Sequence, residues 1–422
     1  MHKLNVIYCG WGEHWPLGTL ADTGQQIVFE YTQQAIERGL QLSPLRQPLP
    51  RAGAAVQAFK GEPAFYGLPG FIADALPDGW GMLLMDRALR KAGRDPRQVS
   101  VLDRLALIGH RAMGALAFEP AQDGELPAEM LQLQALAEEV AQMQLAMDGT
   151  AAADDALRHL MVLGGSPQGA RPKVLLDFNP GSGAMSSGLA LTPGAAPWLV
   201  KFPAGGEHRE VSALEELYAR VARHGGMDMP TSRCFDLGKQ HSAFGVQRFD
   251  RYVAGGATLR VPLISLSALL QADHRVPALD YETLLLATLR ITGDQREVAK
   301  AFERCVVNVL LHNRDDHSRN FAYRLDEQGF WKLSPTFDLT YSFGPGGEHA
   351  TSVAGHGKNI THTHLLQVAK QGGVDIQKAT RCIDHWVGVV RGLPEHVQDL
   401  PIRKTTLQSL VQTTRALCDA VQ

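Results

Sequence analysis

The sequence is poor in cysteine and has no pattern that would pair the cysteines it contains. Its 422 residues include five cysteines, and none of them belongs to a CxxC pair. An odd number of widely separated cysteines argues against a disulfide framework and against a zinc ribbon. We therefore expect the chain to work in a reducing compartment.

Long hydrophobic runs are also missing. A membrane helix needs roughly 18 consecutive apolar residues, and even the best run, at 306–311, contains Asn308. The first residues lack the apolar stretch of a signal sequence. The sequence predicts a soluble, cytoplasmic protein that makes no membrane contact.

Neither sign of charge dominates. Forty-one Lys and Arg stand against 44 Asp and Glu, which gives a formal net charge of -3. This balance excludes a bulk electrostatic attraction to nucleic acid and leaves room only for a local basic patch. The 45% hydrophobic content supports a large core, and the length predicts two or three lobes.

Periodicity and turn residues divide the chain into three predicted domains. Residues 1–127 mix strand-like runs with helical spacing and end in a polar, proline-flanked break at 119–127, which predicts a small α+β unit. Residues 128–256 begin with a predicted helix at 128–147 and continue with strands, as a small nucleotide-binding lobe would. Residues 257–422 carry mostly helical periodicity. The predicted fold class is therefore α+β, with a mostly helical C-terminal lobe.

The densest run of polar residues follows a predicted buried helix. The helix at 297–311 has its hydrophobic side chains on one stripe, and the run His-Asn-Arg-Asp-Asp-His-Ser-Arg-Asn then occupies 312–320. So many polar groups are costly to bury without partners and too dense for an ordinary connector. The run predicts a functional site; the alternative is a capped turn with a surface Asp and Asn.

A predicted β-hairpin at 321–333 returns the chain to this run. Alternating hydrophobic residues on either side of a polar turn indicate the hairpin. Asp315, Asn320 and Asp338 should therefore converge, although 23 positions separate the two aspartates. Two carboxylates and an amide oxygen form a site that suits Mg²⁺ or Mn²⁺, with nucleotide phosphates to complete it.

The spacing Asp-x-x-x-x-Asn, from Asp315 to Asn320, is that of a kinase catalytic loop. In such a loop the Asp takes or orients the proton of the substrate hydroxyl and the Asn holds metal, while a later Asp, here Asp338, binds the bridging metal. The pattern favours phosphoryl transfer. A zinc hydrolase is disfavoured because His312 and His317 match neither HExxH nor HxxEH, and the sequence contains no G-x-S-x-G elbow.

Phosphoryl transfer also needs cations and backbone amides at the phosphates. Lys201 lies in an otherwise apolar predicted strand and is the candidate phosphate lysine; the alternative is an edge-strand lysine that reaches solvent. The glycine-rich run at 164–169 could cradle phosphates, and Arg171 and Lys173 follow it closely. This run matches neither Walker A nor GxGxxG, so a plain turn is the alternative there.

Several of these segments, in their order along the chain, resemble the HipA toxin kinases of bacterial toxin-antitoxin modules. The resemblance spans nearly the whole chain, and several motifs in the family's order are far more specific than any one of them. The matching segments are Leu76-Pro77-Asp78 with Gly81, residues 166–173, 200–203, 248–251 and 315–320, and Phe337-Asp338.

The resemblance implies an ATP- and Mg²⁺-dependent serine/threonine protein kinase. It implies a two-lobed, protein-kinase-like fold with an extra N-terminal α+β subdomain, in which Asp315 is the catalytic base and Asn320 and Asp338 hold Mg²⁺. It also implies that Ser166 matches the serine that family members autophosphorylate, and that Gln247 and Phe249 lie at the adenine hinge. The family's type member has Glu where Gln247 stands. The resemblance also implies that Lys201 touches the ATP phosphates. Together with the glycine-rich run, the full set of candidate nucleotide-binding residues is Gly164, Gly165, Ser166, Gly169, Lys173, Lys201, Gln247, Phe249, Asn320 and Asp338.

The resemblance further implies partners. HipA kinases pair with a helix-turn-helix antitoxin, HipB, that binds DNA, and family members stop translation by phosphorylating an aminoacyl-tRNA synthetase. This chain shows no helix-turn-helix signature, so we expect DNA contact mainly through an antitoxin. Two other functions fit the same motifs: a small-molecule phosphotransferase, and a catalytically idle co-repressor that binds the antitoxin.

Overall fold

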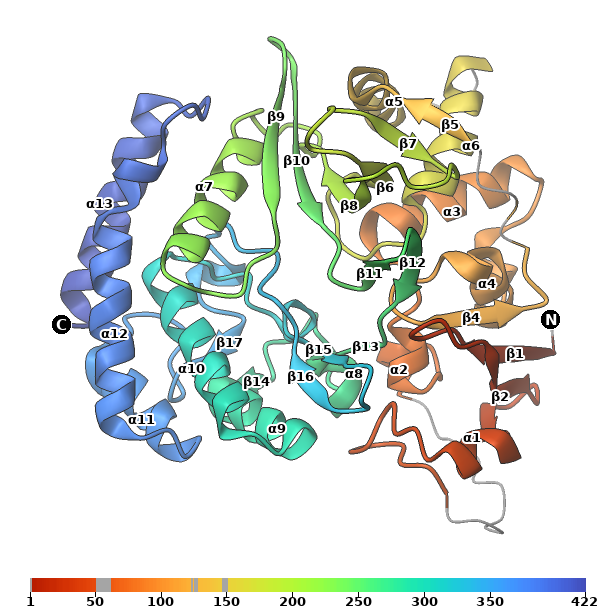
Figure 1. Cartoon of the computed structure of the whole chain (residues 1–422), viewed down its shortest axis with the longest axis horizontal. Helices are drawn as coiled ribbons and strands as arrows, with labels where there is room; N and C mark the ends of the chain where they lie inside the picture. Colours follow the sequence, from red (N-terminus) through yellow and green to blue (C-terminus); the bar gives the residue numbers. More distant parts are fainter. Residues whose placement is uncertain (1, 51–61, 123, 125–127, 146–150) are drawn as a thin grey trace. The chain divides into compact units, whose positions relative to one another are not determined.

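The computed structural model of the chain describes residues 2–50, 62–122, 124, 128–145 and 151–422. The chain divides into two compact units, whose elements Figure 1 labels. Unit 1 comprises residues 1–212 and 233–263, and unit 2 comprises residues 213–232 and 264–422. The first predicted domain boundary falls at residues 125–127, which lie outside the described residues.

Unit 1 begins with a four-stranded antiparallel sheet in the strand order β3-β2-β1-β4. Short helices lie between β3 and β4 in the chain, and the capping box of Ser100 and Asp103 fixes the start of one of them, α4. These elements are β1 (Lys3–Tyr8), β2 (Trp15–Asp22), β3 (Ile27–Tyr31), α1 (Gln33–Arg38), α2 (Gly70–Ala73), α3 (Gly79–Lys91), α4 (Val101–Ile108) and β4 (Leu116–Glu119).

The second part of unit 1 is a six-stranded sheet in the order β5-β7-β6-β8-β10-β9. Two helices, α5 and α6, share one hydrophobic core with this sheet and with Trp80 of α3. A two-stranded ribbon, β11 and β12, completes the unit. The elements are β5 (Glu129–Leu131), α5 (Leu133–Leu145), α6 (Ala151–Gly164), β6 (Lys173–Phe178), β7 (Met185–Ser187), β8 (Ala196–Lys201), β9 (Ser232–Leu237), β10 (His241–Gln247), β11 (Arg251–Ala254) and β12 (Ala257–Arg260).

The start of this part differs from the helix predicted at 128–147. Glu129–Leu131 form strand β5, which pairs with β7, and the helix α5 begins only at Leu133. The residues have helical propensity, but an available sheet edge outweighs a weak intrinsic preference. Residues 146 and 147, the end of the predicted helix, lie outside the described residues.

Unit 2 is mostly helical. Its central helix is α10, whose N-cap Asp294 accepts a hydrogen bond from the backbone of Arg296 and whose hydrophobic stripe is buried. A hairpin of β15 and β16 follows α10. The elements are α7 (Val211–His224, which starts in unit 1), β13 (Leu263–Ser265), α8 (Leu266–Leu270), β14 (Leu279–Asp280), α9 (Tyr281–Thr292), α10 (Gln295–Leu310), β15 (Ala322–Leu325), β16 (Trp331–Leu333), β17 (Thr351–Ser352), α11 (His362–Gln371), α12 (Ile376–Arg391) and α13 (Lys404–Ala420).

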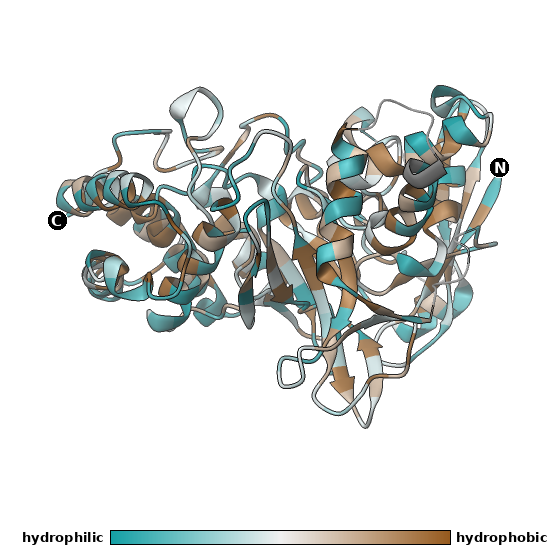
Figure 2. Ribbon diagram, turned by 90° about the horizontal axis from the view of Figure 1, so that it is seen from above, coloured by the Kyte–Doolittle hydropathy of each residue, from teal (hydrophilic) through white to brown (hydrophobic). Residues whose placement is uncertain are grey.

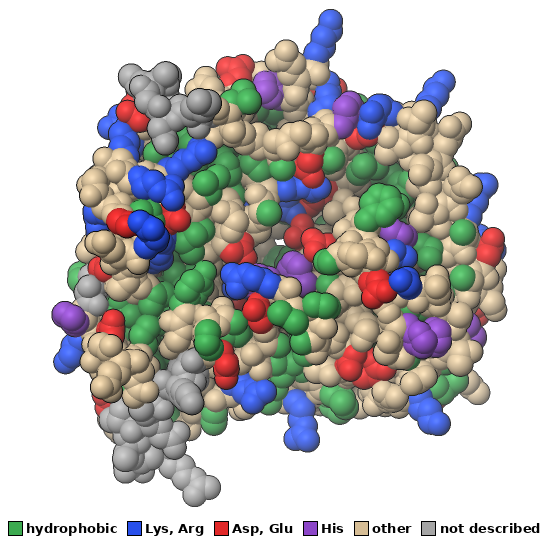
Figure 3. All heavy atoms as spheres, turned by 180° about the vertical axis from the view of Figure 1, so that it is seen from behind, with side chains coloured by type: hydrophobic (Ala, Val, Ile, Leu, Met, Phe, Trp, Pro, Cys, Tyr) green, Lys and Arg blue, Asp and Glu red, His purple; other side chains and the backbone are tan. Residues whose placement is uncertain are grey.

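The distribution of side chains follows the amphipathic patterns of the sequence. In Figure 2 the helices beside the C-terminus carry hydrophilic residues on one side and hydrophobic residues on the other. On the face drawn in Figure 3, positive and negative side chains are interspersed, as the near-neutral net charge leads one to expect. No helix within the described ranges is long and apolar enough to cross a membrane.

Candidate active site

The polar run of unit 2 starts where α10 ends. The last turn of α10 closes with Leu311, whose backbone amide donates to Val307, and the buried Tyr218 hydroxyl donates to the Leu311 carbonyl at 2.7 Å. His312 then adopts a positive φ of 54° and turns the chain out of the helix. The amide of Asn313 donates back to Asn308 O at 2.9 Å. These bonds fix the point from which the polar run departs.

Asp316 anchors the run from inside. Its side chain is fully buried and accepts hydrogen bonds from the Tyr281 hydroxyl at 2.6 Å and from the backbone amides of Ala350 and Thr351 at 2.8 and 3.2 Å. The ring of His349 lies 2.8 Å from it through Nδ1. Burial, together with this neighbouring carboxylate, raises the pKa of Tyr281 well above its ordinary value. The sequence pattern does not single out Asp316.

Asp315, the neighbouring residue, faces outward. Its side chain is 55% exposed, and His317 Nε2 lies 3.9 Å from its Oδ1. The Asn320 amide nitrogen donates to the Asp315 carbonyl at 2.6 Å, which closes the Asp-x-x-x-x-Asn segment into a compact loop. The loop thus exposes one carboxylate and holds Asn320 close beside it, an arrangement in which a carboxylate can meet a substrate hydroxyl.

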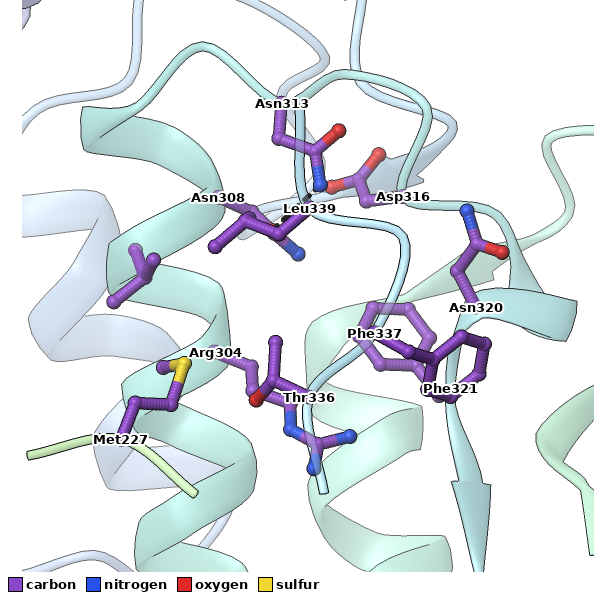
Figure 4. A pocket seen from close by; sticks show the side chains of 11 residues that line it. Met227, Arg304, Asn308, Asn313, Asp316, Asn320, Phe321, Thr336, Phe337 and Leu339 are labelled. Atoms are coloured by element: carbon purple, nitrogen blue, oxygen red, sulfur yellow. Dashed lines mark hydrogen bonds between the residues drawn. The ribbon is translucent and has the colours of Figure 1, made fainter. Parts of the chain in front are cut away.

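A small pocket connects this loop to the segment that contains Asp338. Figure 4 shows side chains from α10, from the polar run and from residues 336–339 around it. Asp338 itself has a positive φ of 54°, which is uncommon for a residue other than glycine and is a frequent feature of functional turns. Seven of the lining residues are Arg304, Asn308, Asp316, Asn320, Thr336, Phe337 and Leu339.

Several polar atoms around this pocket are buried without a hydrogen-bond partner. They are Arg304 Nη1, Asn313 Oδ1 and Thr336 Oγ1. Burial lowers the pKa of Arg304 to about 10, and its other terminal nitrogen donates to the Ser334 carbonyl. Buried polar groups normally have partners, including water, so this part of unit 2 is suited to a hydrated, polar ligand.

The donor set here fits the implied Mg²⁺. Asn320 and Asp338 offer amide and carboxylate oxygens, which are the ligand types that Mg²⁺ prefers. The Asn320 nitrogen is already used in the bond to the Asp315 carbonyl, which orients its oxygen away from that bond. Two protein oxygen donors of these types suit an ion that also binds phosphates.

The glycine-rich run lies in unit 1, at the end of α6. The helix ends at Gly164, and the Gly165 amide donates to Met161 O at 3.1 Å. Gly169 has a φ of 105°, which side chains rarely permit. Ser166 is 5% exposed, and Arg171 pairs with Glu207 at 2.9 Å. The run is therefore a tight turn that leads directly from a helix into strand β6.

Two lysines stand opposite each other beside this turn. Lys173 on β6 and Lys201 on β8 are cross-strand partners, so both side chains lie on the same face of the sheet. The Lys173 ammonium donates to the Gln168 carbonyl within the turn, and the Lys201 ammonium lies 5.9 Å from the centre of the Phe244 ring. Like charges directly opposite each other repel. An anion bound between them would relieve that repulsion.

Of the two predicted hinge residues, Gln247 lies on β10 and does not share the face of the lysines. Gln247 pairs with Trp198 across β10 and β8, three positions from the pair of Phe244 and Lys201, so alternation places the Gln247 side chain on the opposite face. The following segment is fixed by Asp250, which accepts hydrogen bonds from Arg248 and Arg251 and from the Gly114 amide. Phe249 lies between these anchored positions.

Family models match both ends of this architecture. A model described as the HipA-like C-terminal domain matches residues 165–392, which is more than half of the chain. This chain belongs to the HipA family. A second model, described as the HipA N-terminal domain, matches residues 10–119. The family predicted from the sequence motifs is confirmed.

One solved structure shows the same fold over nearly the whole chain. HipA of Shewanella oneidensis MR-1, solved with HipB and its operator DNA, superposes with a TM-score of 0.71 over 98% of this chain and 97% of that one, at 16% identity. The predicted α+β fold class is confirmed by this match. The Helicobacter pylori proinflammatory kinase CtkA aligns over 55% of this chain and 86% of its own, at 10% identity and a TM-score of 0.39, which is too weak to support an inference. No curated protein sequence matches significantly.

Proposed function

We propose that this HipA protein is an ATP- and Mg²⁺-dependent serine/threonine protein kinase and the toxin of a toxin-antitoxin module. The observation that carries the proposal is the compact polar loop in unit 2. It exposes Asp315, holds Asn320 against it, and places Asn320 in one pocket with Phe337 and Leu339, the neighbours of Asp338.

In this proposal Asp315 orients or accepts the proton of the substrate hydroxyl, because its carboxylate is the exposed one of the pair. Asn320 and Asp338 hold Mg²⁺, which neutralises charge on the phosphates when bound. In the same proposal the buried Asp316 is a positioning residue, whose hydrogen bonds to Tyr281 and to the backbone at 350–351 keep Asp315 facing outward. Such a loop positions the substrate hydroxyl and the metal ion, and it forms no covalent bond to the substrate.

Unit 1 supplies the phosphate contacts in the same proposal. Lys173 and Lys201 face each other on neighbouring strands, and the turn at 164–169 offers backbone amides next to them. Gln247 and Phe249 follow on β10 and just after it, where they would meet the base of the nucleotide. Because the Gln247 side chain lies on the face opposite Lys201, we assign its contact to the backbone.

The proposed partners follow from family membership. The Shewanella HipA was solved with HipB and operator DNA, and we propose a HipB-like helix-turn-helix antitoxin for this chain, with DNA bound mainly through it. The proposed target is a translation component such as an aminoacyl-tRNA synthetase, and the proposed compartment is the cytoplasm.

One incubation separates this function from its rivals. The purified chain is mixed with γ-labelled ATP, Mg²⁺ and cell lysate, with the Asp315→Asn variant as the matched control. Label that enters protein serine or threonine only with the wild-type chain supports the kinase. Label in small metabolites supports the phosphotransferase, and label in neither supports the idle co-repressor; both of these results would contradict our proposal.

Ser166 is the proposed autophosphorylation site. The residue is buried in the turn, so its modification requires the turn to open. A phosphate adds roughly -1.5 to -2 charges and would pair with basic groups such as Arg171 and Lys173, which keeps the turn away from the nucleotide. Mass spectrometry after long incubation with ATP and Mg²⁺ should find phosphate on Ser166 in the wild type and none in Asp315→Asn. If Ser166 stays unmodified while a second substrate is phosphorylated, the proposed self-inactivation is wrong and the kinase proposal is unaffected.

A further inference from the structure

The turn at 164–169 is held by a segment almost a hundred residues earlier. The Asp78 carboxylate accepts a hydrogen bond from the Gly169 amide, and the Trp80 amide donates to the Gly169 carbonyl at 3.1 Å. Both backbone groups of Gly169 are thereby bonded to one short stretch of the N-terminal part of unit 1. A residue that is bonded on both sides in this way has little freedom to move.

A side chain of the turn also bonds to the earlier segment. The Gln168 side-chain amide donates to the carbonyls of Asp74 and Leu76 at 2.8 and 3.3 Å. Its own carbonyl accepts from the Lys173 ammonium. Gln168 and Gly169 therefore connect one of the candidate phosphate lysines to the stretch at 74–80.

Asp78 is used in an unusual way for its position. It is the N-cap residue of α3, and an aspartate there normally accepts a hydrogen bond from an amide of its own helix. The Asp78 side chain makes no such bond. It accepts from Gly169 instead, 91 residues away. Asp78 therefore makes its hydrogen bond to the turn and not to its own helix.

Two glycines allow the backbones to approach closely. A Cβ on Gly79 would lie 2.6 Å from the Gly169 carbonyl oxygen, and one on Gly81 would lie 3.0 and 3.1 Å from the carbonyl oxygens of Gly165 and Pro167. Real Cβ atoms almost never show a contact as short as the one at Gly79, and the two at Gly81 are tighter than nearly all real contacts. Side chains at these positions would therefore push the turn away. Between the glycines, Trp80 is 3% exposed and belongs to the core formed by α5, α6 and the sheet. The core packing of Trp80 thus anchors the stretch against which the turn rests.

We propose that Asp78 is a positioning residue for the glycine-rich turn. With Gly79, Trp80 and Gly81 it holds Gly169, and through it the turn, in the shape that presents amides and Lys173 to the nucleotide phosphates. The consequence for the nucleotide rests on the proposed kinase function; the effect on the turn does not. The N-terminal part of unit 1 is, in this account, a structural component of the nucleotide site.

The Asp78 carboxylate could also have the opposite effect on nucleotide binding, and the same experiment distinguishes the two effects. If Asp78 competed with phosphate for the Gly169 amide, its removal would tighten ATP binding. If it positions the turn, its removal weakens binding. The variant Asp78→Asn keeps an oxygen that can accept the Gly169 hydrogen bond, whereas Asp78→Ala keeps none. Asp95→Ala, which removes a partly exposed aspartate paired with Arg97 elsewhere in unit 1, is the matched control.

The experiment uses the full chain and two readouts: hydrogen exchange of the amides at 164–172, and ATP KM with kcat. We expect Asp78→Ala to speed exchange in the turn and raise ATP KM, each roughly ten-fold as for one lost charge-assisted hydrogen bond, while kcat at saturating ATP stays within about two-fold. Asp78→Asn and Asp95→Ala should resemble the wild type. If Asp78→Ala does not fold, Gln168→Ala must show the faster exchange.

Three results would overturn the proposal. These are unchanged exchange and KM in Asp78→Ala, a lower KM in that variant, or Asp78→Asn failing as badly as Asp78→Ala. A wild-type chain that neither binds nor uses ATP would refute the proposed kinase instead. In that case the exchange measurement still decides whether Asp78 holds the turn.

Discussion

The two units hold their candidate site residues by different means. In unit 2 the polar loop depends on side chains that converge on one buried carboxylate, Asp316, whose partners come from α9 and from the segment at 349–351. In unit 1 the glycine-rich turn depends on backbone groups, which Asp78 and Trp80 bond directly. The first arrangement is sensitive to a change of side chain, and the second to any added atom at a glycine.

This difference determines which groups of each candidate site are fixed and which face outward. Asp316 is buried and bonded by several donors, while its neighbour Asp315 faces outward with a side chain that is 55% exposed. A turn held by its backbone keeps its place beside Lys173, whose ammonium donates to the Gln168 carbonyl. The comparison predicts that substitutions in unit 2 separate cleanly into those that affect chemistry and those that affect folding.

The largest expected effect is on chemistry alone. Asp315→Asn should lower phosphoryl transfer by ~10² to 10⁴-fold, the usual contribution of a general base or positioning carboxylate. The fold should persist because the side chain is exposed. Initial rates with labelled ATP, alongside a thermal melt, check both parts. A rate near that of the wild type would end the assignment of Asp315.

Substitution of the next residue, Asp316, should mainly lower the stability of the fold. Asp316→Ala removes the acceptor of bonds from Tyr281, His349 and two backbone amides. Leaving such donors unpaired in the interior should cost roughly 3 kcal/mol of unfolding free energy. Urea unfolding measures this cost, with Asp315→Asn as the matched control. Equal stability of the two variants would break the distinction between the buried and the exposed aspartate.

A smaller effect is expected at the proposed metal ligand. Asp338→Ala should weaken Mg²⁺-dependent ATP binding by roughly ten-fold and more than Asp315→Asn does, since a ligand acts in the ground-state complex and a base mainly in the transition state. ATP titrations with Mg²⁺ and with a chelator test the order. If both variants bind ATP as the wild type does when Mg²⁺ is present, Asp338 is not a ligand.

The smallest effect concerns the helix that leads into the glycine-rich turn. His159 on α6 lies 2.8 Å from Glu139 on α5, and this hydrogen bond raises the His159 pKa above its ordinary value. Because the folded-state pKa is the higher one, the contribution to stability is complete below about pH 6.5 and is lost as the pH rises through the folded-state value.

For a partly exposed pair this contribution should stay below ~1 kcal/mol. Unfolding free energies measured from pH 5.5 to 8.5 should therefore fall slightly more for the wild type than for His159→Gln. Parallel pH profiles for the two proteins would show that the pair contributes nothing.

Local patterns in the sequence predicted much of unit 2. The helix expected at 297–311 is α10 (Gln295–Leu310), and the expected hairpin is formed by β15 and β16. These elements are short-range, so periodicity and turn chemistry suffice to find them. Asp316 was missed because the sequence pattern does not say which of two adjacent aspartates faces inward.

Unit 1 was less predictable because its contacts are long-range. Leu76-Pro77-Asp78 was noticed only as a matching motif, and no local pattern connects Asp78 with Gly169, 91 residues further on. The strand β5 was mistaken for the start of a helix because its pairing partner β7 lies more than 50 residues away. Tertiary pairing of this kind overrides local propensity. The roles of the individual site residues remain predictions.

Single-turnover phosphate transfer at increasing ATP concentration tests the central claim most directly. The account assigns phosphate binding to Lys201 and chemistry to Asp315, so Lys201→Ala should regain transfer as ATP is raised, whereas Asp315→Asn should stay slow at every concentration. A wild-type rate for Asp315→Asn at saturating ATP, or no transfer by the wild-type chain itself, would contradict the account.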